Sequence, residues 1–86
     1  MKNKTQLPKW FNGTTYDEGD TVTNPFSGEE YKLTNLELSM YDFIMGCNRV
    51  FATGSNRVND EMIKDFEKGL DWFRKTNAKA YMVLLD

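Results

Sequence analysis

The apolar residues of this chain change their spacing at Thr34, and this change constrains the fold more than any other feature. Across residues 29–33, apolar and charged side chains alternate, which is the pattern of a half-buried strand. Across residues 36–51, apolar side chains recur three and four positions apart, as on one face of a helix. Thr34 and Glu37 have the spacing of a capping box, in which each side chain accepts a hydrogen bond from the other's backbone amide. The sequence therefore predicts a strand that passes directly into a helix.

The strand before Thr34 is expected to be the second arm of a β-hairpin. Residues 20–24 contain the Thr and Val that favour a pleated surface. The segment between the two arms reads NPFSG (residues 24–28) and has the chemistry of a turn. Pro25 fixes its own φ, and Gly28 can adopt the left-handed conformation that closes the loop. We therefore predict an N-terminal β-hairpin region.

A second helix is expected to follow a short link. Gly54 has the position of a left-handed residue that ends the first helix, and Asn59 or Asp60 can cap the next one. Apolar side chains recur at helical spacing through residues 62–73, with acids at the start of the helix and bases at its end. Because the link is short, the two helices are expected to pack as an antiparallel pair. Gly69 lies on the apolar face, so a close approach of the helices is expected there.

The C-terminal residues 78–85 are good helix formers, and Asn77 can cap a helix. A short C-terminal helix is therefore favoured, with a buried C-terminal strand as the alternative. Residues 1–9 are polar and are expected to form a flexible segment, with residues 10–86 as a single small globular domain. The predicted fold is α+β: an N-terminal β-hairpin region packed on an antiparallel helical pair, plus a short apolar C-terminal helix.

The sequence has few of the histidine and cysteine residues that enzymes often use for catalysis, and this argues against an enzyme. The chain has no histidine, which is the commonest general base and metal ligand. Its single cysteine, Cys47, falls in the apolar pattern of the first predicted helix, where a buried thiol is expected rather than a nucleophile. Asp17, Glu18 and Asp20 form an acidic turn with too few oxygens, in the wrong order, for a calcium loop. We therefore expect no catalytic residue, no cofactor and no bound metal.

Charge and hydropathy restrict the classes of partner. Eleven Lys and Arg stand against thirteen Asp and Glu, which gives a net charge of −2, and the bases do not cluster as nucleic-acid binding requires. The longest apolar run, residues 81–85, is too short to span a membrane. Residues 1–9 lack the apolar core of a secretory signal, and a single cysteine suits a reducing compartment. We expect a cytoplasmic protein with neither nucleic acid nor membrane as its partner.

Aromatic residues are the remaining candidates for a binding surface. They exceed what a hairpin and two short helices obviously need to cover, although a chain of this length has a thin core that uses most of them. The alternative is that some of these aromatic residues stay exposed and form a contact patch, because Trp and Tyr are enriched in binding hot spots. For Phe26, burial against the helices is favoured over exposure as an anchor. The candidate protein-binding residues are Trp10, Phe26 and Tyr41, with Asp17, Glu18 and Asp20 as contacts for a basic partner.

The stretches NPFSGEEYKLTNLELSMYDFI and GLDWFRKTNAKAYMVLLD resemble small uncharacterised proteins encoded by tailed phages that infect marine cyanobacteria. The resemblance covers residues 8–86 and implies a phage accessory protein without assigned activity, so it supplies no catalytic residues. We therefore expect a small non-enzymatic accessory protein that docks on a host or viral protein in the host cytoplasm and modulates it. The alternative is a minor virion or assembly protein that self-associates as a homo-oligomer.

Overall fold

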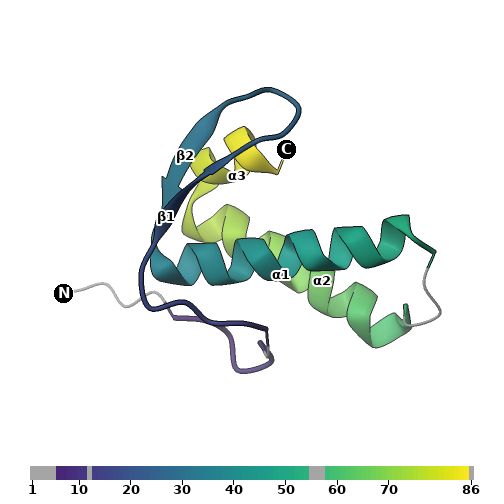
Figure 1. The fold of residues 1–86 in the computed structure, drawn as a ribbon. Coiled ribbons are helices and arrows are strands. Elements are labelled where there is room, and N and C mark those ends of the chain that lie inside the picture. The colour runs from purple at the N-terminus through teal and green to yellow at the C-terminus, as the bar shows by residue number, and fades with distance from the viewer. Residues whose placement is uncertain (1–5, 12, 55–57, 86) are drawn as a thin grey trace.

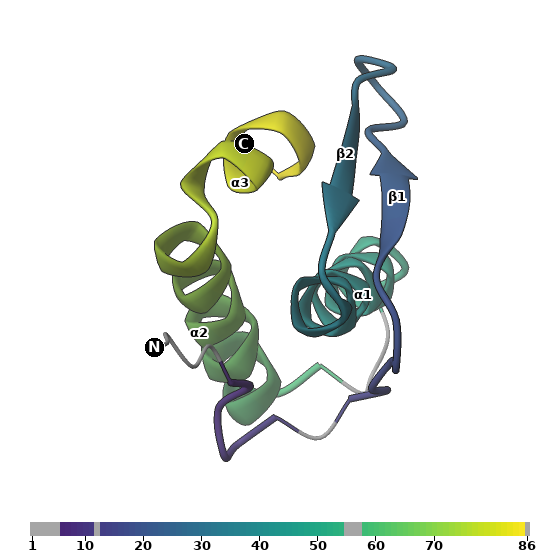
Figure 2. The same cartoon turned by 90° about the vertical axis from the view of Figure 1, so that its left-hand side faces the viewer.

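The computed structural model describes residues 6–11, 13–54 and 58–85. Two antiparallel strands precede three helices along the chain (Figure 1): β1 (Asp20–Thr23), β2 (Glu30–Leu33), α1 (Asn35–Ala52), α2 (Asp60–Thr76) and α3 (Ala78–Leu84). The predicted α+β fold is confirmed, and the C-terminal element is the favoured helix rather than the alternative strand. Figure 2 shows that the hairpin and α3 lie over the same end of the helical pair, on its two sides. No helix within the described ranges has the length and apolar character needed to cross a membrane.

The hairpin follows the predicted alternation. Val22 pairs with Tyr31, and Asp20 pairs with Leu33 at the base of the hairpin. Leu33 is buried and Val22 and Tyr31 are half-buried, while the residues between them face solvent. Gly28 has a φ of 80°, which is the left-handed conformation expected for the end of the loop. One face of the hairpin is therefore available to cover the helices.

The helix ends form as their sequence predicts. The Thr34 hydroxyl accepts a hydrogen bond from the Glu37 amide (3.2 Å), and the Glu37 carboxylate accepts one from the Thr34 amide (3.0 Å). This is the predicted capping box at the start of α1. Gly54 follows α1 with a φ of 66°, as expected for the residue that ends the helix. Asn59 caps α2 by accepting a hydrogen bond from the Met62 amide (2.8 Å).

The two long helices approach closely at Gly69. A Cβ atom on Gly69 would lie 3.1 Å from Met40 Sδ and 3.4 Å from Ile44 Cγ1. The predicted close approach at this position is therefore confirmed. Gly46 of α1 differs, because a Cβ atom there would have no neighbour within 4 Å.

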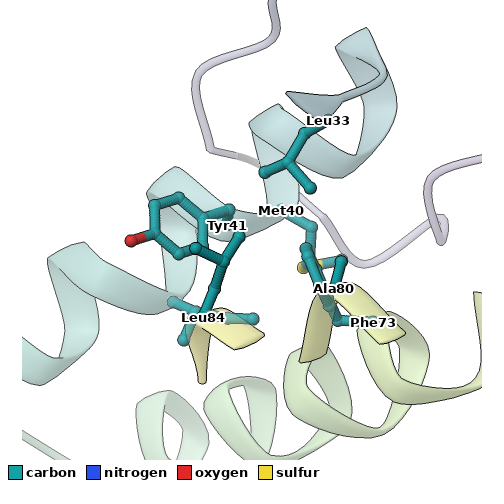
Figure 3. Packing of buried hydrophobic residues seen from close by; sticks show 7 residues of the cluster. Leu33, Met40, Tyr41, Phe73, Ala80 and Leu84 are labelled. Carbon is teal, nitrogen blue, oxygen red and sulfur yellow. The ribbon is translucent and has the colours of Figure 1, made fainter. Parts of the chain in front are cut away.

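The core lies where the hairpin and α3 meet the helical pair. Leu33 comes from β2, Met40, Tyr41 and Ile44 from α1, Phe73 from α2, and Ala80 and Leu84 from α3 (Figure 3). Four of these seven residues have no exposed surface at all, namely Met40, Ile44, Phe73 and Ala80. We call this cluster of seven residues the junction. Every element except β1 contributes to it, so the packing of the whole domain depends on it.

A polar network crosses the junction at Asn77, the residue between α2 and α3. The Asn77 side-chain amide donates a hydrogen bond to the Glu37 carboxylate (3.1 Å). Its oxygen accepts hydrogen bonds from the Ala80 amide (3.1 Å) and from the Tyr31 hydroxyl (3.4 Å). Asn77 therefore caps α3 as predicted and also links α3 to α1 and β2. Because Glu37 is buried, its carboxylate depends on these partners for the hydrogen bonds that water would otherwise provide.

The segment before Trp10 packs more than its sequence suggests. Leu7 packs against the core, and the Trp72 indole donates a hydrogen bond to the carbonyl oxygen of Gln6 (3.0 Å). Gln6 and Leu7 of the segment expected to be flexible (residues 1–9) therefore make contacts with the rest of the domain, and residues 1–5 lie outside the described ranges. Through these two contacts the segment lies against the core and against Trp72 of α2. In both views it lies on the side of the helical pair away from the hairpin loop and α3 (Figures 1 and 2).

Candidate functional site

The loop of the hairpin presents Phe26 to solvent. The Phe26 side chain is 96% exposed, far more than any other large apolar residue described. The expectation that the ring would be buried against the helices is therefore wrong. The physical reason lies in the loop itself, whose polar groups are bonded in an arrangement that leaves the ring outside.

Asn24 provides most of these bonds. Its side-chain oxygen accepts hydrogen bonds from the amides of Phe26 (2.8 Å) and Ser27 (3.3 Å), as in an Asx turn. Its side-chain amide donates a hydrogen bond to the carbonyl oxygen of Val83 in α3 (2.9 Å). Its own carbonyl oxygen accepts one from the Gly28 amide (2.9 Å). The loop is therefore bonded both internally and to α3, and these bonds order the backbone on which Phe26 stands.

A hollow of about 180 Å³ lies beside Phe26, between the hairpin loop, α1 and the end of α3. All of its described lining residues are uncharged: Asn24, Pro25, Phe26, Met45, Asn48, Leu84 and Leu85. We call Phe26 together with this hollow the tip surface. It combines a protruding aromatic ring with an adjacent recess, whose surface is about half apolar and half polar.

The other predicted aromatic contacts have more structural roles. Tyr41 is only 9% exposed, and its ring centroid lies 6.5 Å from that of Phe73, so most of this side chain is used in the core. Its role as a protein contact stays a prediction. Trp10 is half-buried and packs against Phe43 with the centroids 5.7 Å apart, while the Lys68 ammonium lies 5.9 Å from its ring. A broader hollow of about 570 Å³ opens beside Trp10 and Lys68. Most of the aromatic surplus is therefore used to widen the core.

The acidic residues lie at the other end of the hairpin from Phe26. Asp17 and Glu18 are exposed in the segment that leads into β1, and Asp20 begins β1 opposite Leu33. The Asp20 carboxylate accepts a hydrogen bond from the Thr21 amide (2.7 Å). The structure therefore does not gather the predicted contacts into one site. The acids and the tip surface lie at opposite ends of the hairpin. The N-terminal segment that carries Trp10 lies on the other side of the helical pair from the hairpin loop (Figure 1).

Sequence reasoning missed the residues that form the hollow. Met45 and Asn48 lie three positions apart on α1, where Met45 packs at the edge of the core and Asn48 is exposed. Leu85 follows α3, where it read only as part of an apolar tail. Asn24 gave the one usable signal, because an Asn before Pro in a turn commonly bonds the amides that follow it. Its link to Val83 joins residues far apart in the sequence and leaves no local pattern.

The described residues offer little for covalent or metal chemistry. They contain no group of three or more His, Cys, Asp or Glu side chains that could hold a metal ion. Cys47 is 3% exposed, as predicted for a buried thiol. Burial, and secondarily the Asp65 carboxylate, raise the pKa of this thiol and so disfavour the reactive thiolate. Cys47 therefore lacks the electropositive surroundings that activate a cysteine nucleophile.

Comparison with known protein families, with curated proteins and with solved structures found no match to this chain.

Proposed function

We propose that this chain is a small non-enzymatic protein that acts by docking on another protein through the tip surface. The observation that carries the proposal is the exposure of Phe26 in a loop whose conformation is fixed by Asn24. An isolated exposed apolar residue needs no explanation by itself. Here, however, the loop bonds to α3 and to itself in the conformation that keeps the ring in water.

An aromatic ring on an ordered loop is well suited to binding. Association costs free energy when side chains and loops become ordered, and a loop that is already ordered avoids much of this cost. Aromatic residues are enriched at the centres of protein interfaces, and charged residues are depleted there. The tip surface has this composition, because its described residues are uncharged and include Phe26, Met45 and Leu85.

The resemblance to proteins of tailed phages supports a host or viral protein as the partner, met in the host cytoplasm and modulated by the contact. The acids Asp17, Glu18 and Asp20 are proposed to add a second, electrostatic contribution. They are exposed near the base of the same hairpin, where they would attract a basic partner and increase its rate of association. The main binding free energy would come from Phe26, because exposed charges are screened by salt.

Affinity capture from host lysate tests the proposal with three forms of the chain. Phe26→Ala is expected to lose the captured partner, whereas Met82→Ala is expected to retain it. Met82 is the matched control because it is 67% exposed, lies on α3 and does not line the hollow. Equal capture by the wild type and both variants would show that the tip surface is not the contact. Replacing Asp17, Glu18 and Asp20 with amides should slow association and weaken its salt dependence if the acids contribute.

A second candidate function is a structural one, in which the chain is a minor virion or assembly component that self-associates. The observation that favours it is the hollow next to Phe26, which gives the same surface both a protrusion and a recess. Stable association with purified particles would support this function over binding to a separate host protein.

A further inference from the structure

We propose that the tip surface binds a second copy of this chain, in a two-fold dimer in which Phe26 of each copy inserts into the hollow of the other. This inference rests on the proposed function, because it requires the tip surface to be a protein-binding surface. It specifies the partner and the contact: one phenyl ring in one recess, made twice across a two-fold axis.

The size of the hollow fits one phenyl ring. Its volume is about 180 Å³. An engineered apolar cavity of roughly 150 Å³ is large enough to bind benzene, and the side chain of phenylalanine ends in the same ring. The recess is lined by Pro25, Met45, Leu84 and Leu85, which give an inserted ring apolar contacts. The side chains of Asn24 and Asn48 form the polar part of its lining.

The ring of the same chain does not fill this recess. Phe26 contributes to its lining, yet 96% of the side chain is exposed. The hydrogen bonds of Asn24 to the Phe26 amide and to Val83 hold the loop in this conformation. The ring therefore borders the recess without filling it, and the recess is open to a ring from a second copy.

This arrangement is self-complementary, which is the requirement for a two-fold contact. In such a contact the same patch of each copy faces the other, so a protrusion and a matching recess side by side are each used twice. Charge also permits the contact. Each copy has a net charge of −2, but the described residues of the tip surface are uncharged, so these residues set no like charges against each other across the contact.

Two variants test the ring and the recess separately. Phe26→Ala removes the ring and keeps the recess. Asn48→Arg keeps the ring and places a long charged side chain at the recess, on an exposed position of α1 where arginine is a good helix former. Sedimentation over a concentration series is expected to show a dimer for the wild type. Each variant alone should dissociate at least about tenfold more readily, since about 1.4 kcal/mol of lost contact corresponds to that factor.

Mixing the two variants gives the decisive measurement. The arginine variant supplies a ring and the alanine variant supplies an open recess, so the mixed dimer regains one of the two insertions. Its dissociation constant, measured with one variant fluorescently labelled, should lie between those of the wild type and of either variant alone. Thermal melting of each variant checks that it remains folded, and Met82→Ala controls for the loss of an exposed apolar side chain elsewhere.

Three results would overturn the inference. The first is a wild-type chain that stays monomeric up to about 1 mM, the weak end of measurable affinities. The second is a dimer that neither variant weakens, and the third is a mixture that associates no better than the separate variants. The proposed function is judged separately. A monomeric chain that loses a captured host protein on Phe26→Ala would keep the proposed function and refute the dimer. A Phe26-dependent dimer whose Phe26→Ala variant captures the same host proteins as the wild type would keep the dimer and refute docking on a host protein through the tip surface.

Discussion

The two halves of the helical pair differ greatly in burial. In the half near the junction, Met40, Ile44 and Phe73 have no exposed surface. In the distal half, which comprises α1 after Cys47 and α2 before Gly69, no described residue is buried. The aromatic pair of this half, Phe51 and Phe66, packs edge to face at 5.1 Å between ring centroids, but both rings are only half-covered.

The difference comes from what lies over each half. Two helices alone can cover only the strip where they touch, so the side chains on either side of that strip stay partly in water. At the junction, the hairpin and α3 add further layers that close the core (Figure 2). An apolar helical face therefore shows which side of a helix is covered, but a third element decides how completely. The distal half should also open more readily than the junction, because it has less buried apolar surface to lose.

The largest expected effect compares one phenylalanine from each half. Phe73→Ala should lower the free energy of unfolding by about 3–5 kcal/mol, because it leaves a cavity in a fully buried site. Phe66→Ala should cost about 1–2 kcal/mol, because a half-buried ring loses less transfer free energy and leaves no closed cavity. Urea denaturation of both variants measures the difference. Equal costs would show that the distal half is packed as well as the junction.

The two asparagine residues that cap α2 and α3 provide a second comparison. Both Asn77 and Asn59 accept a hydrogen bond from the first turn of a helix, but only Asn77 also bonds the buried carboxylate of Glu37. Asn59→Ala should cost about 1 kcal/mol, as for an ordinary cap. Asn77→Ala should cost about 2–3 kcal/mol, because it also removes a hydrogen bond from a buried charged group. If chemical denaturation gives the same cost for both, the network at Asn77 adds nothing beyond its cap.

Two helical glycines should respond with opposite signs. Gly69→Leu should destabilise the fold by about 1–3 kcal/mol, because the side chain would have to displace Met40 and Ile44 where the helices touch. Gly46→Ala should stabilise it by about 0.5–1 kcal/mol, because the added methyl group meets open space and alanine favours the helix. Thermal melting distinguishes the two. A Gly69→Leu variant that melts at or above the wild-type temperature would refute the close approach.

Local features of this fold could be predicted from sequence because each depends on neighbouring residues. The capping box at Thr34, the left-handed glycines and the cap at Asn77 are all set by a few adjacent groups. The candidate site could not be predicted in this way. The loop that carries Phe26 is tied to α3 by the hydrogen bond from Asn24 to Val83, which joins residues 59 positions apart. Similarly, Tyr41 lies in the core because α2 and α3 happen to cover that side of α1.

The smallest expected effect is a loss of stability at alkaline pH, and it concerns Cys47, the last buried residue of α1 before the distal half. Burial, and then the nearby Asp65 carboxylate, raise the pKa of this thiol above its ordinary value of 9.0. The folded chain therefore keeps a proton that the unfolded chain loses near pH 9.0. The stability contributed by the protonated thiol is fully present below that pH and is lost as the pH rises toward the folded-state pKa.

Burial also raises the pKa of Tyr41, whose ordinary value is 10.0, so its contribution should be lost at a higher pH than that of Cys47. Urea midpoints measured between about pH 7 and pH 11 for the wild type, Cys47→Ala and Tyr41→Phe separate the two groups. The Cys47→Ala variant should be less stable than the wild type at neutral pH. As the pH rises, it should lack the first part of the decline in stability, which the wild type owes to the Cys47 thiol. If its decline matches that of the wild type, Cys47 is deprotonated equally easily in both states. The boundary of the buried region would then lie before Cys47, closer to the junction.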